Sequence, residues 1–509
     1  MAKFILSDEH KKKRSEKKKF VLRYDVFGSY LGREMGPKDY FDFHFSYPQN
    51  VDKVIIDGME GGDFYSMYES KLIPMRKNPR NARFKSEGID IFGAWVTEVH
   101  RRGQECWLSH RISEVPIEVD ANPFTAHEEH PDWFIPAFLD FKMFNLANPE
   151  VREHKRKILA EVMRKYDFDG LDIDFERHTP CLPEGKQWEM REEVTEFMRM
   201  LRRETLKIAE ETGRVVMLSA RVPDCLEGCH EDGLDIEKWL EEDLVDALTM
   251  GSRSFDVKIE DIRALSDEIQ LYGCYETHHA VDGYALTTLD VIRGVWYSYH
   301  KRGADGVEYF NWMGEGQPEL VKKYVTEYGM NYVRDGFALY AHEDFTGIED
   351  KDFLAKQDKT YVIDRKGGYP WGVGYGNLNA EKQLPVTFDK EGSVKLYVGD
   401  DAADYRSALL TVLIEETEIL PEIYLNGKKL DFVAKPHRDM QVTTEKEAPV
   451  SGYGVNTRLL KGIDISKPCI LLTADVTGTH TEIGYQDILI KTKSAVTVEK
   501  AELKLSEFL

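Results

Sequence analysis

Short apolar runs alternate with amphipathic helical patterns through the first 312 residues, and this alternation constrains the fold more than any other feature. The runs that we predict as strands are 19–27, 52–58, 104–113, 169–176, 214–223, 244–251, 269–277 and 304–312. Helical stripes between them are clearest in 150–166, 187–210 and 288–303. Strands that return to one sheet through helices form right-handed parallel units. Eight strands in about 300 residues therefore predict an α/β fold, a (β/α)8 or TIM barrel.

Helical patterns disappear from residue 370 onward, and strands bounded by turn residues take their place. The Asn-Gly pair at 426–427 is a strong hairpin signal among them. We therefore expect an all-β sandwich that braces the barrel, with ligand binding as the alternative role. The predicted domains are a basic N-terminal arm (1–18), the barrel (19–330), a connector (331–369) and the sandwich (370–509).

The acidic composition limits the partners of the chain. Its 68 Lys and Arg face 91 Asp and Glu, a formal net charge of -23, which disfavours nucleic acid and anionic membranes. No apolar run reaches the roughly 18 residues that a membrane-spanning helix needs. The amino terminus lacks the apolar core of a signal peptide, so we expect a cytoplasmic protein, with a trimmed secreted chain as the alternative. We expect the basic run 11–19 to be a solvated arm, with a localisation or anion-binding tag as the alternative.

The cysteines and glycines carry no cofactor signature. Six scattered cysteines without a CxxC pair fit reduced thiols. No glycine-rich phosphate loop follows any predicted strand, which disfavours nucleotide binding. We predict no metal and no organic cofactor, and the sequence leaves a homo-oligomer open.

Polar and ionisable residues stand at the end of nearly every predicted strand. This position matters because the active sites of barrel enzymes lie at the carboxyl ends of the strands. Strand ends are polar in general, since loops begin there, but several of these residues have a buried setting. The candidates are Asp57, His110, Arg111, Asp172, Asp174, Glu176, Arg177, His178, Arg221, Glu276, His278, Glu308, Asn311 and Trp312.

The fourth predicted strand, in FDGLDIDFERH (168–178), places three carboxyl groups on one face. Alternate side chains point to opposite faces, so Asp172, Asp174 and Glu176 point into the barrel and the apolar residues between them face the helices. Glu176 lies nearest the mouth, and Asp174 below it can hydrogen-bond to it or hold its proton. Close carboxyl groups raise at least one pKa, as a general acid requires near neutral pH.

Residues 169–176, DGLDIDFE, resemble the DGxDxDxE signature of family 18 glycoside hydrolases, the chitinase family. The resemblance implies that Glu176 protonates the glycosidic oxygen. It implies that Asp174 orients the acetamido group of the substrate, whose carbonyl attacks the sugar, and that Trp312 stacks on the sugar. The chain departs from the family pattern in two places: the sixth strand region, LTMGSRSFD, has no Tyr-Asp, and the third, CWLSHRIS, has no Ser-x-Gly-Gly.

A broader resemblance covers most of the chain. It is carried by HPDWFIPAFLDFKMFNLANPEVREHK, YDFDGLDIDFERH, LSARVPDCLEGCHEDGLDIEKWLEEDLVDAL and RGADGVEYFNW. These segments are similar to those of bacterial barrels with a trailing β domain that are classed as glycoside hydrolases by analogy. The resemblance implies hydrolysis of glycosidic bonds in an oligosaccharide or small glycoside.

Glu276 is a second candidate carboxyl group, at the end of the seventh predicted strand. Glutamates at the ends of strands four and seven resemble the arrangement of retaining barrel glycosidases, where the first is acid/base and the second nucleophile. A carboxyl separation of about 5–5.5 Å implies retention and one of about 6.5–9.5 Å implies inversion. The working partner of Glu176 is therefore Asp174 or Glu276, and a plain surface glutamate is the alternative for Glu276.

Hydroxyl-rich ligands need planar polar groups and aromatic faces, so a carbohydrate substrate gives the remaining strand-end residues a role. Glu176, Asp174 and Glu276 are the catalytic candidates, and the other strand-end residues are substrate-binding candidates. Tyr275 joins Trp312 as a stacking candidate. Several arginines at the mouth would also admit an anionic sugar.

Three alternatives stay open. The carboxyl cluster could be a structural ion network with Arg111, Arg177 and Arg221. The chain could be a metal-dependent hydrolase that uses Asp172 and Asp174 with His178 or the His278-His279 pair. It could also be a non-catalytic, carbohydrate-binding barrel.

Overall fold

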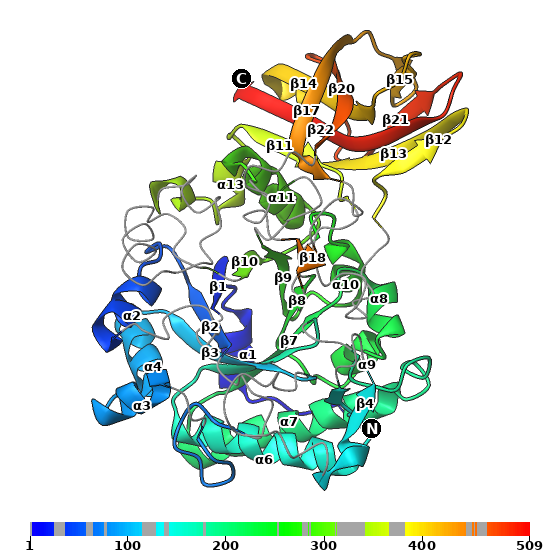
Figure 1. The fold of residues 1–509 in the computed structure, drawn as a ribbon. Helices are drawn as coiled ribbons and strands as arrows, with labels where there is room; N and C mark the ends of the chain where they lie inside the picture. The colour runs from blue at the N-terminus through cyan, green and yellow to red at the C-terminus, as the bar shows by residue number, and fades with distance from the viewer. Residues whose placement is uncertain are drawn as a thin grey trace.

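The computed structural model describes residues 3–24, 36–57, 65–75, 79–113, 129–136, 142–176, 180–251, 254–276, 284, 287–310, 312, 342–365, 382–443, 450–451, 454–455 and 466–509. Within these ranges the chain forms a barrel followed by an antiparallel β domain (Figure 1). Helices surround the barrel, and the β domain lies beside α11 and α13.

Eight parallel strands close into a barrel, which confirms the predicted fold class. They are β1 (Phe20–Tyr24), β2 (Lys53–Asp57), β3 (Glu105–Arg111), β6 (Gly170–Asp174), β7 (Met217–Val222), β8 (Ala247–Met250), β9 (Gln270–Tyr275) and β10 (Gly306–Phe310). Each of these strands pairs with the next one along the chain, and β10 pairs with β1 to close the ring. The order is therefore that of a TIM barrel, and the loops after the strands gather at one end.

Helices and short turns of helix connect the strands. They are α2 (Pro37–His44), α3 (Pro79–Ser86), α4 (Ile91–Arg101), η1 (Pro131–Trp133), α6 (Pro149–Lys165), α7 (Arg191–Thr212), α8 (Leu226–Glu231), α9 (Ile236–Glu241), α10 (Ile259–Leu265) and α11 (Leu289–Lys301). The side chain of Asn148 caps α6, with Pro149 at its first position. Gly213 ends α7 with a φ of 71°, the left-handed conformation that glycine adopts most easily. A short hairpin of β4 (Phe134–Pro136) and β5 (Lys142–Phe144) precedes α6.

The basic amino terminus is a packed helix, so the expectation of a solvated arm is wrong. Helix α1 (Asp8–Ser15) lies across the amino ends of the barrel strands. His10 is 2% exposed, with its Nε2 2.8 Å from Asp246 Oδ1, and Lys13 pairs with Asp169 at 2.9 Å. His10, Lys13 and Arg14 thus meet carboxyl groups that are distant in sequence, which is why the helix packs instead of extending into water.

The β domain consists of two main antiparallel sheets, in agreement with the predicted sandwich. One sheet contains β11 (Lys359–Val362), β22 (Val496–Phe508), β14 (Tyr405–Glu415), β20 (Ser466–Asp475) and β17 (Val433–Thr443), with β12 (Val386–Phe388) beside β22. The other contains β13 (Glu391–Val398), β21 (Gly484–Lys491), β15 (Glu422–Leu425) and β16 (Lys428–Lys429). The smaller elements are η4 (His342–Phe345), α13 (Lys351–Leu354), η5 (Ala402–Asp404), β18 (Val450–Ser451) and β19 (Gly454–Val455). Strand β11 falls within the segment predicted as a connector, yet it pairs with β22.

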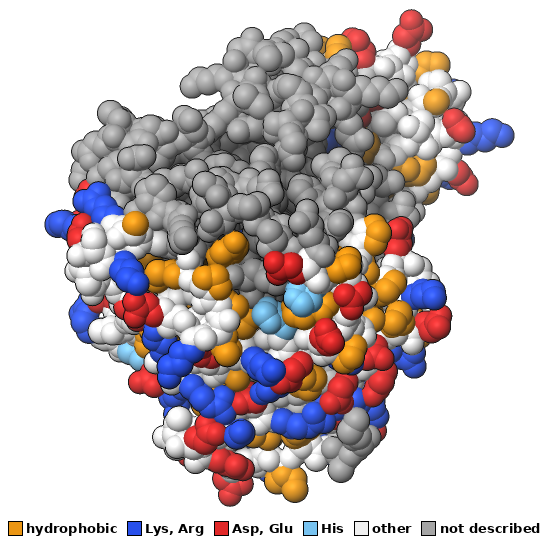
Figure 2. Space-filling model, turned by 60° about the horizontal axis from the view of Figure 1, so that its bottom comes forward, with side chains coloured by type: hydrophobic (Ala, Val, Ile, Leu, Met, Phe, Trp, Pro, Cys, Tyr) orange, Lys and Arg blue, Asp and Glu red, His pale blue; other side chains and the backbone are white. Residues whose placement is uncertain are grey.

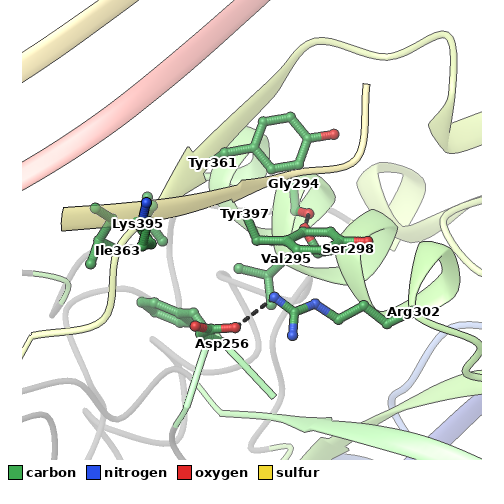
Figure 3. Close-up of a pocket in the computed structure, with 11 residues that line it drawn as sticks. Asp256, Gly294, Val295, Ser298, Arg302, Tyr361, Ile363, Lys395 and Tyr397 are labelled. Carbon is green, nitrogen blue, oxygen red and sulfur yellow. Dashed lines mark hydrogen bonds and ion pairs between the residues drawn. The ribbon is translucent and has the colours of Figure 1, made fainter. Parts of the chain in front are cut away.

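The β domain packs directly on α11. The guanidinium group of Arg302, which caps α11, lies 3.8 Å from the ring centre of Tyr397 and donates to the Tyr485 hydroxyl at 2.9 Å. Figure 3 shows this interface, with Tyr361 and Tyr397 of the β domain above α11 and the ion pair of 2.6 Å between Arg302 and Asp256. The interface is therefore both aromatic and charge-paired.

Charged side chains of both signs mix on the described surface in Figure 2. None of the described helices combines the length and the apolar composition that crossing a membrane requires. All six cysteines are buried and outside any disulfide.

Candidate active site

The lowest interior layer of the barrel is closed by large side chains. Val21, Ile55, Trp107 and Tyr272 pack together there, and the ammonium group of Lys53 lies 3.9 Å from the ring centre of Trp107. Gly170 is required at the start of β6, because a Cβ at this position would collide with the Trp107 ring. Any site must therefore lie above this layer, toward the carboxyl ends of the strands.

The next layer is an ion network centred on Arg23. Its Nη1 donates to Asp172 Oδ2 at 2.8 Å, and its Nε donates to Glu308 Oε1 at 2.7 Å. Ser109 and Ser219 also donate to Asp172, at 3.0 and 2.6 Å. Each of these five side chains is at most 3% exposed. Asp172 and Glu308, both predicted to bind substrate, are thus held inside the barrel by protein partners.

Asp174 forms a second buried ion pair. Arg221 donates to its two oxygens from Nε at 3.0 Å and from Nη2 at 2.7 Å. Burial alone would raise the pKa of Asp174, but Arg221, Arg23 and Arg111 outweigh it and lower the pKa to about 2. Asp174 Oδ1 also accepts from the backbone N–H of Glu176 at 2.9 Å. Asp174 is therefore a permanent carboxylate that anchors the backbone of Glu176, not a group that exchanges a proton near neutral pH.

A third ion pair joins Arg111 Nε to Asp57, and both side chains are 3% exposed. They come from the last residues of β3 and β2, which are neighbours in the barrel. Arg111 is also close enough to lower the pKa of Asp174. The predicted residues Asp57, Arg111, Asp174 and Arg221 therefore do meet at the carboxyl end of the barrel.

Glu176 and Glu276 follow β6 and β9 at this end, where strand alternation predicts that both side chains continue the inward-facing series. Phe175 packs on Trp239 of α9, with ring centres 5.6 Å apart, so the alternation turns Glu176 away from the helices. Glu276 follows Tyr275, whose ring packs against Trp296 of α11. Glu176 is 1% exposed and Glu276 is 0% exposed. Among the described residues, four carboxyl groups pair with three guanidinium groups at these levels, namely Asp57, Asp172, Asp174 and Glu308 with Arg23, Arg111 and Arg221.

Three of the predicted residues, His110, Tyr275 and Trp312, do not join this cluster of ion pairs. His110 points toward the helices, with its Nε2 3.4 Å from Lys155 Nζ on α6, because Ser109 takes the inward position on β3. Tyr275 is also on the helix side. Trp312 is 1% exposed and meets Phe345 edge to face, with ring centres 5.2 Å apart. The predictions for Arg177, His178, His278 and Asn311 lie outside the described residues.

The described part of the chain contains no group of three or more His, Cys, Asp or Glu side chains that could hold a metal ion. Asp172 and Asp174, two ligands of the metal-dependent alternative, instead bind guanidinium groups. The negative charges of these two carboxylates are thus already neutralised by arginine side chains.

Asp232, which caps the carboxyl end of α8, is not among the residues predicted from the sequence. This side chain is 4% exposed, and neither carboxyl oxygen has a hydrogen-bond partner within the described structure. Burial raises its pKa well above the ordinary value, and the charges of Glu176 and Glu231 raise it further. In the sequence, the segment HEDGLD resembles an exposed helix stop, so only the packing of α8 could reveal this group.

No family model and no curated protein matches this chain. Several solved structures are similar at low identity. An α-L-fucosidase isoenzyme 2 from Paenibacillus thiaminolyticus is 14% identical, with a TM-score of 0.40 over 68% of this chain and 51% of that one. A cycloisomaltooligosaccharide glucanotransferase from Paenibacillus sp. is 9% identical, with a TM-score of 0.36 over 96% of this chain and 57% of that one.

An α-amylase from Anoxybacillus is 12% identical, with a TM-score of 0.37 over 97% of this chain and 99% of that one. This chain spans only about half the length of the fucosidase and the glucanotransferase, 51% and 57%. Because these TM-scores are below 0.5, the fold assignment rests on the strand pairing of the chain itself.

Proposed function

We propose that the chain is a glycoside hydrolase that cleaves an oligosaccharide or small glycoside, with Glu176 as the general acid. The observation that carries this proposal is the column of carboxyl groups that runs along β6 and continues beyond its end. The two lower groups, Asp172 and Asp174, are paired with Arg23 and Arg221. Glu176 is the uppermost group of the column, at the end of the barrel where barrel enzymes bind substrates.

In this mechanism Glu176 donates its proton to the glycosidic oxygen while the bond between that oxygen and the sugar breaks. The burial of Glu176, which is 1% exposed, favours its protonated form beforehand. The hydrogen bond of 2.9 Å from its backbone to Asp174 holds the acid in position.

We assign the second carboxyl role to Glu276 and not to Asp174. Asp174 is held by both donors of Arg221 and has a pKa of about 2, so it is not available as a proton carrier. Glu276 directly follows the seventh strand of the barrel, β9, and is 0% exposed. If Glu276 is the nucleophile, the first product keeps its anomeric configuration, which proton NMR of the early reaction mixture measures. An inverted first product would contradict the nucleophile role.

The experiment is a panel of chromogenic glycosides, which also includes uronides. The wild-type protein should hydrolyse at least one of them, and Glu176→Gln should lower kcat by about 10² to 10⁴-fold. Glu189→Gln is the matched control, because this exposed glutamate lies in the loop that follows the same strand. Full activity of Glu176→Gln would exclude the acid role. Activity that a chelator abolishes and an added divalent metal restores would support the metal-dependent alternative.

A further inference from the structure

One lysine joins three segments that are far apart in the sequence. Lys382, which precedes β12, donates from Nζ to Ser254 Oγ, in the segment after β8, at 2.6 Å. The same ammonium group donates to Asp224, after β7, at 2.9 Å and to Asp364, after β11, at 3.2 Å. These three acceptors match the three donors of an ammonium group, and each of the accepting side chains is at most 5% exposed. Lys382 therefore ties the β domain to two segments that follow barrel strands.

Asp364 also holds the backbone of the segment after β8. Its carboxylate accepts from the backbone N–H of Phe255 at 2.8 Å and from that of Asp256 at 2.8 Å. Burial lowers the pKa of Lys382, but Asp224 and Asp364 outweigh it and raise the pKa, so Lys382 stays a cation. A buried carboxylate needs such a cation, so the grip of Asp364 on this backbone depends on Lys382.

The segment that is held in this way packs on the end of β9. Phe255, which is 4% exposed, stacks on Tyr275, the last residue of β9. Their ring centres are 6.2 Å apart and their planes are inclined by 21°. Glu276 is the next residue along the chain, so Phe255 supports the strand immediately before the proposed nucleophile.

Tyr299 of α11 makes a second connection between the two segments. Its hydroxyl group donates to the carbonyl oxygen of Ser254 at 2.7 Å and lies 3.2 Å from the carbonyl oxygen of Cys274 on β9. The Tyr299 ring lies against β9 so closely that a Cβ at Gly273 would collide with it. A continuous series of contacts therefore runs from Lys382 through Ser254 and Tyr299 to the strand that leads into Glu276.

We propose that Lys382 is a positioning residue for Glu276, because it holds residues 254–256 against the end of β9 and so fixes the backbone that carries the nucleophile. This inference rests on the proposed function, in which Glu276 is the nucleophile. It deepens that function by giving the β domain a part in catalysis. The rate should be sensitive to this support, since a displacement of about 1 Å in a reacting group can cost about 10²-fold.

The activity test is covalent labelling of Glu276 by a 2,4-dinitrophenyl 2-deoxy-2-fluoroglycoside of the sugar that the wild-type protein hydrolyses fastest. A carboxylate oxygen of Glu276 bonds to the anomeric carbon as the bond to dinitrophenolate breaks, and the fluorine slows hydrolysis of the product. Mass spectrometry of the intact protein and of its peptides follows the label. Lys382→Met should lower the maximal labelling rate by about 10 to 10²-fold and leave the half-saturating concentration unchanged.

Lys429→Met is the matched control for this test. Lys429 also belongs to the β domain, but it is 54% exposed and pairs with Glu422, so its variant should take up label at the wild-type rate. An unchanged labelling rate in Lys382→Met would overturn the proposal.

A second readout does not depend on catalysis. Amide hydrogen exchange of peptides that cover 254–258 and 270–276 should be faster in Lys382→Met than in the wild type, and unchanged in Lys429→Met. Tyr299→Phe, which keeps the ring and removes the hydroxyl group, should speed exchange in the same peptides if Lys382→Met fails to fold. Unchanged exchange would overturn the positioning role. If the wild-type protein takes up label on a residue other than Glu276, the proposed nucleophile is wrong, whereas the exchange result alone decides whether Lys382 holds the end of β9.

Discussion

At Asp174, burial and the neighbouring positive charges shift the pKa of the carboxyl group in opposite directions. Burial raises its pKa, whereas Arg221, Arg23 and Arg111 lower it, and the pKa settles at about 2. No cation of the described residues lowers the pKa of Asp232, which burial and the charges of Glu176 and Glu231 raise well above its ordinary value. The pKa values of these two carboxyl groups are therefore shifted in opposite directions, and among the described residues the difference comes from which of them an arginine reaches.

Arg221→Met should destabilise the fold by about 3–5 kcal/mol, because it leaves the buried carboxylate of Asp174 without the cation that holds both its oxygens. The measurement is the free energy of unfolding from denaturant titration. Arg101→Met is the matched control: it breaks an ion pair with Glu98 whose arginine is 68% exposed, and it should change stability little. Equal effects of the two substitutions would show that Asp174 does not depend on Arg221.

The strand alternation in the sequence was sufficient to predict that Asp172 and Asp174 point into the barrel, since both meet partners there. The same alternation predicts that His110 faces the helices and is not a substrate-binding residue, because Ser109 before it takes the inward position. Arg23 was not predicted as a site residue, because the candidates were the last residues of each strand and Arg23 lies within β1. Asp232 could not be found in this way, because it lies in no strand and its burial appears only in the folded chain.

Among the elements, α1 departs most from its prediction. A run of lysines in a sequence usually indicates a solvated segment. Here the helix covers the amino ends of the barrel strands, and the side chain of Gln270 on β9 donates to the carbonyl oxygen of Arg14 at 3.0 Å. The carboxyl groups that receive its charges, Asp169, Asp243 and Asp246, are more than 150 residues away in sequence. A local pattern cannot report such partners.

His10→Ala should destabilise the protein by about 1–3 kcal/mol, because Asp246 is 0% exposed and loses one of its hydrogen-bond partners. Activity should remain, since α1 lies at the end of the barrel opposite Glu176. The measurement is thermal unfolding together with a glycosidase assay. The control is His480→Ala, which removes a histidine that is 85% exposed and pairs with Asp401. If both substitutions leave the unfolding temperature unchanged, α1 does not contribute to stability.

On the scale of the whole molecule, the β domain is joined to the barrel close to the strand ends. Lys382 donates to Asp224, which follows β7, at 2.9 Å and to Asp364, which follows β11, at 3.2 Å. The backbone N–H of Phe255, in the segment after β8, donates to Asp364 at 2.8 Å. Segments that follow barrel strands therefore contact the β domain, and the two parts should unfold together.

Gly294→Ala should test this coupling. A Cβ at Gly294 of α11 would collide with the carbonyl oxygen of Thr360 in β11, and such overpacking costs about 1–3 kcal/mol. Gly93→Ala in α4 is the matched helical control. Its Cβ would be in ordinary contact at 3.5 Å from Asp90, so the substitution should be neutral or stabilising. Calorimetry should show one lowered transition for Gly294→Ala. A separate early transition for one domain would contradict the joint unfolding.

The most direct test of the account compares leaving groups on the sugar that the wild-type protein hydrolyses fastest. A general acid matters for a poor leaving group, such as an unsubstituted phenol or a second sugar, and hardly at all for a 2,4-dinitrophenolate that departs without a proton. Glu176→Gln should therefore lose about 10² to 10⁴-fold in kcat/KM on the poor leaving groups and much less on the dinitrophenyl glycoside. An equal loss on both substrates, or no loss on either, would contradict the assignment of Glu176 as the acid.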